Sequence, residues 1–274
     1  MGALSLLLAT AAAASLTPLQ KAQLVVVTTE RPRVFSGAAH IRFADQEGGS
    51  VKALPGSPPW KVARDYSTAA GALAAGRATR LALERAGIDI DFAPVLDAPD
   101  GPLGSREFRS GAIAAAFARG LGEAACVKHF PGLGTAAVST DARPHVDAYV
   151  RPVDLAPFRA AIRAGVRCVM VGNAFYGTRF RASLEPSTYL RLRRLGFSGV
   201  AITDSLSIVR EAPVERWAPQ AVRAGADMVL FTSPAQAERA IRALVPLARR
   251  GELDEHVARV LRYGAELRSL RVPR

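Results

Sequence analysis

The stretch that decides the fold reads Ala125-Cys-Val-Lys-His-Phe-Pro-Gly-Leu-Gly134. A short apolar run leads into Lys128 and His129, and a Pro/Gly-rich turn follows at once. The pattern predicts a buried strand that ends in two hydrogen-bonding side chains. In parallel α/β folds the carboxyl ends of the strands carry the chemistry, because the sides of the strands are packed against helices. We therefore expect a functional site here, with an ordinary turn after a buried strand as the alternative for so short a motif.

Further apolar runs of strand length lie on both sides of this stretch, and segments with helical spacing separate them. This alternation favours an α/β fold of the TIM-type (β/α)8 barrel kind, complete or shortened, over a doubly wound sheet. No Gly-x-Gly-x-x-Gly follows any of the runs, which argues against a dinucleotide-binding fold. The expected strands are 23–29, 39–44, 88–95, 125–129, 167–171, 200–203 and 227–231. The expected helices are 16–22, 60–86, 110–122, 154–164, 186–195, 215–224, 234–249 and 253–270.

The chain has 274 residues, of which 49% are hydrophobic, and this suits one large domain or two small ones. No linker or internal repeat divides it, so we expect a single barrel domain over residues 16–274. Residues 1–15 have an apolar centre and a small-residue end, as a signal peptide does, but they lack its basic start. A helical or disordered N-terminus is the alternative. Location in the cell envelope and in the cytoplasm are therefore equally favoured, and the segment is too short to predict a membrane span.

The net charge is +12. The arginines are scattered through the expected helices, Arg159 and Arg163 being examples, and no basic run is interleaved with aromatic residues. This distribution is typical of solvated helix faces and argues against a nucleic-acid partner. An anionic cell-wall polymer is a weaker alternative.

The two cysteines, Cys126 and Cys168, each lie inside an expected strand, and their spacing fits no zinc motif. The pattern favours buried thiols over a disulfide between neighbouring strands, although the sequence does not decide between the two. No metal and no cofactor is expected.

Polar residues gather where the expected strands end. In a barrel these ends surround one mouth, so their side chains are expected to converge. Carboxylates, a lysine and a histidine, joined by Arg106 from a polar loop, suit a ligand rich in hydroxyl groups, because charged groups form strong hydrogen bonds to hydroxyls. The strand-end residues are Asp45, Asp97, Lys128, His129, Asn173 and Asp204.

At these positions the sequence resembles glycoside hydrolase family 3. The central stretch is similar to the family's Lys-His-Phe-Pro-Gly-His-Gly signature, and 45–49 reads Asp-Gln-Glu-Gly-Gly as in the family. Residues 91–97, Asp-Phe-Ala-Pro-Val-Leu-Asp, resemble a family strand that begins with Asn. Residues 105–108 resemble its Arg-Ser-Phe loop, and 195–206 resemble the strand that carries the nucleophile. The resemblance covers about residues 16 to 232, the N-terminal barrel domain only, and is nearest to single-domain bacterial β-N-acetylglucosaminidases.

The resemblance implies a retaining glycoside hydrolase that acts on β-linked terminal sugars of the N-acetylglucosamine or glucose type, with peptidoglycan fragments among the substrates. Asp204 would attack the anomeric carbon and form a covalent glycosyl-enzyme. Asp45, Arg106, Lys128 and His129 would bind the sugar hydroxyls. Asp97 and Asn173 would complete the substrate-binding set, Asp97 mainly by shaping the site. The oligomeric state is left open.

The loop that supplies the acid/base departs from the family pattern. Family members have Asp-Ser-His there, as an Asp/His dyad, whereas this chain has Ser139-Thr-Asp141, and the second histidine of the signature is Leu133. Asp141 could donate the proton if burial or a neighbouring carboxylate raises its pKa. His145 is a second candidate, and a site without a protein acid is the third.

Two other functions therefore stay open. The first is a catalytically weak or inactive barrel that binds sugars or cell-wall fragments, because the hydroxyl-binding groups are present and the dyad is replaced. The second is a lyase or aldolase that uses Lys128 as a Schiff-base amine. It leaves the motifs around Asp45 and Asp204 unexplained.

Overall fold

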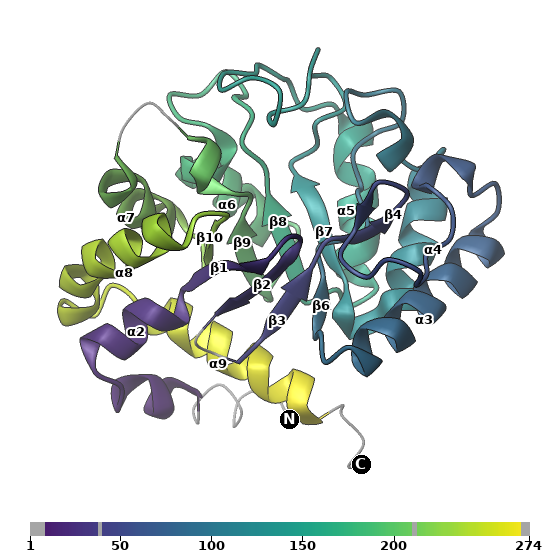
Figure 1. Ribbon diagram of the computed structural model, residues 1–274. Coiled ribbons are helices and arrows are strands. Elements are labelled where there is room, and N and C mark those ends of the chain that lie inside the picture. The colour runs from purple at the N-terminus through teal and green to yellow at the C-terminus, as the bar shows by residue number, and fades with distance from the viewer. Residues whose placement is uncertain (1–8, 38–39, 210–212, 270–274) are drawn as a thin grey trace.

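Strand β7 (Cys126–Phe130) lies among the central strands of the fold, and the helices surround them (Figure 1). The structure is a computed structural model, and it describes residues 9–37, 40–209 and 213–269. The other strands are β1 (Val26–Arg31), β2 (Val34–Gly37), β3 (Arg42–Ala44), β4 (Gln46–Gly48), β5 (Val51–Lys52), β6 (Ile90–Asp91), β8 (Cys168–Val171), β9 (Val200–Thr203) and β10 (Val229–Phe231). The sequence therefore predicted the place of β1, β3 and β6 to β10.

The strands are assigned to three sheets. One has the order β10-β1-β2-β3-β6, another the order β7-β8-β9, and a two-stranded sheet pairs β4 with β5. Isolated parallel bridges join Asp91 to Ala125 and Val95 to Lys128, and a third joins Ile202 to Met228. The three-stranded sheet thus lies between the two edges of the five-stranded sheet, but the ladder is interrupted and forms no continuous closed barrel.

The prediction of purely parallel strands was wrong for the first part of the chain. Strand β2 was not expected, and it runs antiparallel to both β1 and β3. Residues 32–33 form the hairpin turn that joins β1 to β2, with Arg33 at a φ of +59°. A four-residue strand with only two buried positions gives too weak a pattern to be recognised from sequence. Residue 39 of the expected strand 39–44 lies outside the described residues.

The α-helices cover the outside of the strands. They are α2 (Pro18–Leu24), α3 (Ala69–Arg85), α4 (Gly111–Leu121), α5 (Pro152–Arg163), α6 (Pro186–Arg194), α7 (Val214–Ala224), α8 (Pro234–Arg249) and α9 (Asp254–Ser269). Their bounds agree with the prediction to within two residues at each end, except at 60–86. That helix begins only at Ala69, because the side chain of Thr68 accepts a hydrogen bond from Gly71 N and caps the helix there.

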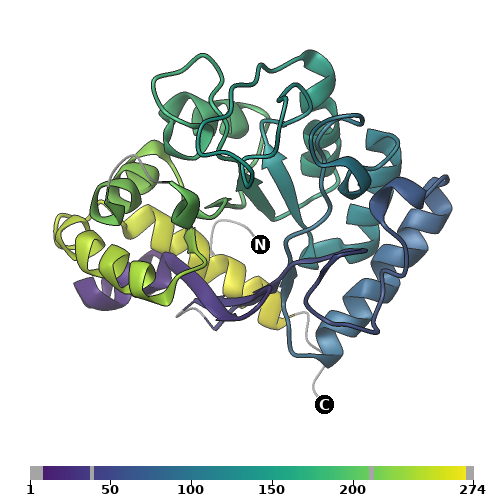
Figure 2. The same cartoon turned by 45° about the horizontal axis from the view of Figure 1, so that its top comes forward.

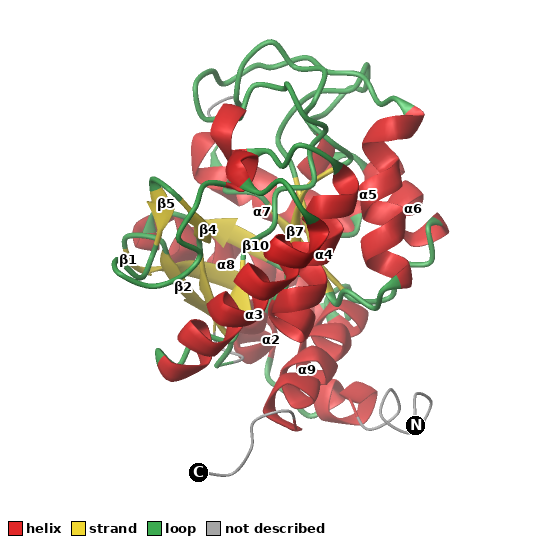
Figure 3. Cartoon of the chain, turned by 90° about the vertical axis from the view of Figure 1, so that its right-hand side faces the viewer, coloured by secondary structure: helices red, strands yellow, loops and turns green. Residues whose placement is uncertain are grey.

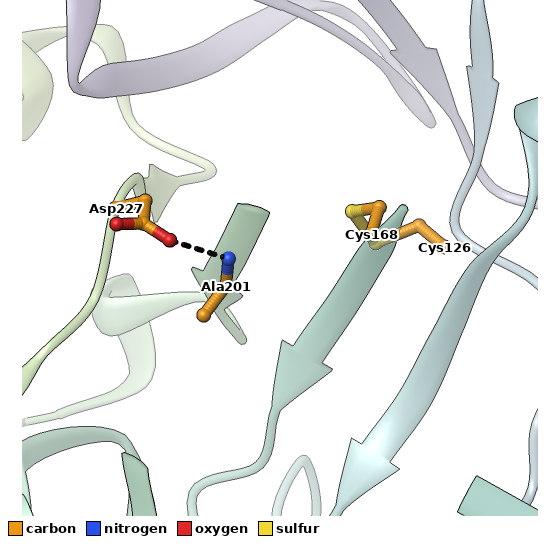
Figure 4. Close-up of a disulfide and its surroundings, with 4 residues drawn as sticks. All are labelled: Cys126, Cys168, Ala201 and Asp227. Carbon is orange, nitrogen blue, oxygen red and sulfur yellow. Dashed lines mark hydrogen bonds between the residues drawn. A yellow bond between two sulfur atoms is a disulfide. The ribbon is translucent and has the colours of Figure 1, made fainter. Parts of the chain in front are cut away.

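Cys126 and Cys168 form a disulfide, so the preference for free thiols was wrong (Figure 4). The two residues are register partners on the parallel strands β7 and β8, and their Cα atoms are 4.4 Å apart. Both side chains are fully buried. The bond ties together the two strands whose opposite ends lead into Lys128, His129 and Asn173.

The loops that follow the strands gather at one end of the molecule (Figures 2 and 3). Among them are the long segments 131–151 and 172–185, which follow β7 and β8. Helices α2 and α9 lie at the opposite end (Figure 1). None of the described helices combines the length and the apolar character that crossing a membrane requires. Residues 1–8 of the segment interpreted as a signal peptide lie outside the described residues, whereas residues 9–14 are helical.

Candidate active site

Lys128 is a buried cation held by two carboxylates. Its Nζ lies 2.7 Å from Oδ1 of Asp45 and 2.7 Å from Oε1 of Glu47, and its side chain is 3% exposed. Burial lowers the pKa of Lys128, but the charges of Asp45 and Glu47 outweigh it and leave the pKa above its ordinary value. The amine is therefore protonated, which disfavours the Schiff-base alternative, because that chemistry needs a neutral lysine.

Glu47 joins Lys128 to the arginine of the polar loop. Arg106 Nε donates to Oε2 and Nη2 donates to Oε1, both at 2.8 Å. Burial would raise the pKa of Glu47, but Lys128 and Arg106 together lower it to about 2. The backbone can take this path because residue 48 is glycine. Its φ is +107°, and a Cβ there would lie 2.4 Å from the carbonyl oxygen of Lys61.

Asp97 holds His129 in place. Its Oδ2 lies 2.8 Å from Nδ1 of His129, and its Oδ1 accepts the backbone N–H of Leu133 at 2.7 Å. The carboxylate is 0% exposed. Since Nδ1 faces Asp97, the Nε2 side of the ring is the side left for a ligand. Asp97 therefore fixes the orientation of the His129 ring, whereas the predicted roles of both residues toward a substrate stay predictions.

Asp204 follows directly on β9 and is partly buried. Burial raises the pKa of its carboxyl group, electrostatic interactions with His129 and Lys128 counteract this rise, and the negative charge of Asp141 adds to it. Its Oδ1 accepts the backbone N–H of Ser205 at 2.7 Å. The structure thus brings Asp204 within electrostatic reach of Lys128 and His129 on β7.

Asp141 lies in the loop that crosses this end of the fold. Its Oδ2 is 4.0 Å from Nη1 of Arg106, and its side chain is 69% exposed. The contact with Arg106 and the electrostatic effect on Asp204 place Asp141 beside the predicted site. The position that departs from the family pattern is therefore still occupied by a group that can exchange protons.

His145 has other partners. Its ring stacks on Phe175, with centroids 4.2 Å apart, and its Nε2 lies 3.3 Å from Oδ1 of Asp147. Phe175 also lies under the guanidinium of Arg181, which donates to the carbonyl oxygen of Pro144. These contacts fasten the loop of Asp141 to the segment after β8. A role of His145 in catalysis stays a prediction.

Both ends of the Asn173 side-chain amide are engaged within the protein. Its Nδ2 donates to the carbonyl oxygen of Ser205 at 3.0 Å, and its Oδ1 accepts from the Ser183 hydroxyl at 2.6 Å. Asn173 is 1% exposed. It therefore supports the turn that carries Asp204, and the predicted contact with substrate stays a prediction.

Glu47 was not predicted as a site residue, although it belongs to the recognised motif of residues 45–49. The signal that could have found it was a carboxylate two positions after Asp45. Asp91, which lies in β6 and contacts the same motif through Gln46 N, was not predicted either. Among the described residues, no group of three histidine, cysteine or acidic side chains is placed to hold a metal ion.

The comparisons with known proteins concern the family and the fold of the chain. The family model described as "Glycosyl hydrolase family 3 N terminal domain" matches residues 16–263. The chain is 32% identical over 238 residues to a "Beta-hexosaminidase" of Stenotrophomonas maltophilia, covering 73% of this chain and 69% of that protein. It is 34% identical over 235 residues to a "Beta-hexosaminidase" of Thioalkalivibrio sulfidiphilus, covering 73% and 67%.

Solved structures show the same likeness. A β-N-acetylhexosaminidase from Beutenbergia cavernae aligns with a TM-score of 0.74 and 30% identity, over 81% of this chain and 78% of that chain. The structure titled "M tuberculosis LpqI" aligns with a TM-score of 0.77 and 25% identity, over 92% and 95%. The TIM-barrel-like fold of the matched domain is therefore shared, with the interrupted sheets described above.

Proposed function

We propose that this chain, which belongs to glycosyl hydrolase family 3, removes β-linked terminal sugars of the N-acetylhexosamine type by a retaining mechanism. The observation that carries the proposal is the position of Asp204, directly after β9 and close enough to Lys128 and His129 for both to lower the pKa of its carboxyl group. The relatives named as hexosaminidases support N-acetylglucosamine as the first sugar to test, with glucose as the second and peptidoglycan fragments as natural sources.

In the proposed reaction the ionised carboxylate of Asp204 attacks the anomeric carbon. A glycosyl-aspartate bond forms, the bond from that carbon to the leaving oxygen breaks, and the leaving oxygen takes up a proton. Water then attacks the same carbon, gives up a proton and releases Asp204 as a carboxylate. Each half-reaction inverts the anomeric centre, so the product keeps the β configuration.

The charged cluster would hold the sugar while this happens. Asp45 has a carboxylate oxygen that can accept from hydroxyls, while Lys128, Arg106 and His129 can donate to hydroxyl oxygens. Glu47 and Asp97 fix the directions of these groups. Because the site is built from pairs that are already formed, little ordering is needed when the sugar binds.

Asp141 is the proton donor in this proposal. It belongs to a loop fastened over the site, and its charge acts on Asp204, as expected for two carboxyl groups that share one reaction. His145 is the second candidate. The strands would surround the site as a shortened (β/α) barrel, with residues 16–274 as one catalytic domain.

Covalent labelling tests the proposal directly. In one reaction the protein is incubated with an activated 2-fluoro derivative of glucose, and its peptides are analysed by mass spectrometry. In a second reaction the turnover of the corresponding N-acetylglucosamine substrate is measured. A sugar mass on the peptide that contains Asp204, and loss of turnover in Asp204→Ala, are expected. Asp100→Asn is the matched control, because Asp100 is an acidic side chain that is 83% exposed and pairs with Arg64. Full turnover by Asp204→Ala contradicts the proposal.

A sugar-binding protein without turnover is the second candidate function. The observation that favours it is the replacement of the expected dyad by Ser139 and Asp141. Calorimetric titration of the wild type with N-acetylglucosamine and with muropeptides separates the two functions. Binding without hydrolysis of any aryl glycoside supports the second, whereas hydrolysis excludes it.

A further inference from the structure

Asp91 is a buried acid that the proposed reaction does not use. It stands where the resembling family strand has Asn, and its side chain is 0% exposed. Its backbone pairs with Ala44 of β3 on one side and forms a bridge with Ala125 on the other. It therefore lies between the strand that leads to Asp45 and the strand that carries Lys128.

The two carboxylate oxygens of Asp91 differ in their hydrogen bonds. Oδ1 accepts the backbone N–H of Gln46 at 2.9 Å, and Gln46 is the residue between Asp45 and Glu47. The other oxygen, Oδ2, is buried and has no hydrogen-bond partner within the described part of the chain. An ionised carboxylate needs donors at both oxygens to offset the loss of water, so this environment favours the neutral acid.

The charges around Asp91 point the same way. The charged groups that act on it are Lys128, Asp45 and Glu47, and Arg106 lies behind Glu47. Asp45 and Glu47 already balance Lys128 and Arg106 in number, and an ionised Asp91 would add a third negative charge. Burial raises the pKa of Asp91 well above its ordinary value, against the opposing effects of the Gln46 N–H and Lys128.

We infer that Asp91 is an uncharged carboxylic acid that positions the backbone of Gln46 and so sets the spacing of Asp45 and Glu47. Its ionisation limits the activity of the site at alkaline pH. When Asp91 ionises at high pH, its charge competes with Asp45 and Glu47 for Lys128. The ammonium group of Lys128 is then drawn toward Asp91 and away from the hydroxyls of the sugar. The part of this inference that concerns the sugar rests on the proposed function, whereas the charge state of Asp91 does not.

The charge state is tested without any substrate, by the pH dependence of thermal stability in Asp91→Asn and wild type. A carboxyl whose pKa is raised by folding stabilises the protein below its unfolded value, near 3.8, and this contribution is lost as pH rises through the folded value. The melting temperature of Asp91→Asn relative to wild type is therefore expected to increase steadily as pH rises above about 4.

Asp227→Asn is the matched control for this measurement. Asp227 is also 0% exposed, but its pKa is lowered to about 2, because cationic partners outweigh the effect of burial. Its melting temperature relative to wild type should stay constant above pH 4, since Asp227 is then ionised in both states. A difference for Asp91→Asn that is equally constant overturns the inference. Difference infrared spectra give a second measurement, in which the carbonyl band of a protonated acid must be present in wild type and lost in Asp91→Asn.

The effect on the site is tested by the pH profile of kcat/KM for an aryl N-acetylglucosaminide. Above the pKa of Asp91, kcat/KM of the wild type should fall about tenfold per pH unit relative to that of Asp91→Asn, as for any one-proton ionisation. Lys128 does not titrate in this range, because its pKa is raised. Identical profile shapes overturn this part. Absence of turnover in both proteins counts against the proposed function, and the stability measurement still decides the charge of Asp91.

Discussion

Arg106 and Glu47 form two parallel hydrogen bonds, Nε to Oε2 and Nη2 to Oε1, each 2.8 Å long. The same Oε1 lies 2.7 Å from Nζ of Lys128. Glu47 is thus the common partner of two cations that come from different parts of the chain, a short 3-10 turn and strand β7. Each cation is aligned through the carboxylate between them.

Replacing Glu47 with Gln should therefore disturb both cations at once. The change leaves Arg106 and Lys128 without the charge of a buried partner, and breaking a buried pair in this way costs about 3–5 kcal/mol. Urea denaturation of Glu47→Gln and wild type measures the loss. Glu30→Gln is the control, because the Arg42–Glu30 pair has side chains 34% and 35% exposed and should be worth under about 1 kcal/mol. Equal effects of the two substitutions would show that burial of Glu47 adds nothing.

Asp141 should influence the pH range in which Asp204 works. Because Asp141 raises the pKa of Asp204, removing its charge should lower that pKa. If Asp204 must be ionised to attack, the acid limb of the kcat/KM profile then moves to lower pH in Asp141→Asn. If Asp141 is also the proton donor, the variant loses about 10²–10⁴-fold in kcat on substrates with poor leaving groups and much less on activated aryl glycosides.

Asp100→Asn is again the control for the Asp141 experiment, since Asp100 pairs with Arg64 outside this contact. An acid limb that stays in place in Asp141→Asn contradicts the electrostatic link between the two carboxyls. An equal loss on good and poor leaving groups contradicts the role of proton donor. If His145 is the proton donor instead, the larger loss of kcat on poor leaving groups is expected in His145→Asn.

The sequence predicted strands β7 to β10 to within about two residues, because each is a continuous buried run. Such runs can be recognised without knowing which strands they pair with. Strand β6 is only Ile90–Asp91, although the apolar pattern extends over 88–95. The residues after Asp91 pack in the core, and their strand pairing is limited to an isolated bridge of Val95 with Lys128. Strand β2 was missed because its pairing, not its composition, makes it a strand.

The candidate site was predictable to the extent that it lies at strand ends. Asp45, Lys128, His129, Asp97 and Asp204 could be placed together by that rule alone. Glu47 had only the weaker signal of lying two residues after Asp45, since the direction of its side chain toward Lys128 is a property of the folded backbone. Disulfide formation between Cys126 and Cys168 also depended on the register of β7 and β8, which is a property of the folded sheet.

The disulfide should stabilise the protein measurably. It closes a sequence separation of 42 residues, and a bond across a loop of this length contributes about 2–4 kcal/mol by restricting the unfolded chain. The double variant Cys126→Ala/Cys168→Ala should therefore unfold at lower urea concentration than wild type. A reductant present during unfolding should lower the stability of wild type and leave the double variant unchanged. A reductant effect of equal size on both proteins would contradict the bond.

At the amino end of β10, Asp227 should protect the fold against acid. It accepts from Arg193 Nη2 at 2.7 Å, from Arg259 Nε at 2.6 Å and from Ala201 N at 2.9 Å, the last contact being drawn in Figure 4. Burial alone would raise the pKa of Asp227, but the hydrogen bond with His256 and the charges of Arg259 and Arg193 lower it to about 2. A depressed carboxyl pKa stabilises the fold above the unfolded value, near 3.8, and this contribution is lost as pH falls through about 2.

Asp227→Asn should therefore be less stable than wild type by about 3 kcal/mol or more at neutral pH, because it leaves two arginines without their buried partner. The difference should shrink between pH 4 and 2, where wild type loses the same charge by protonation. Denaturation followed at a series of pH values measures this convergence. Since Asp227 lies at the opposite end of the strands from Asp204, hydrolysis of an aryl glycoside per folded molecule should change little. A constant stability difference down to pH 2 would show that Asp227 acts through packing and not through its charge.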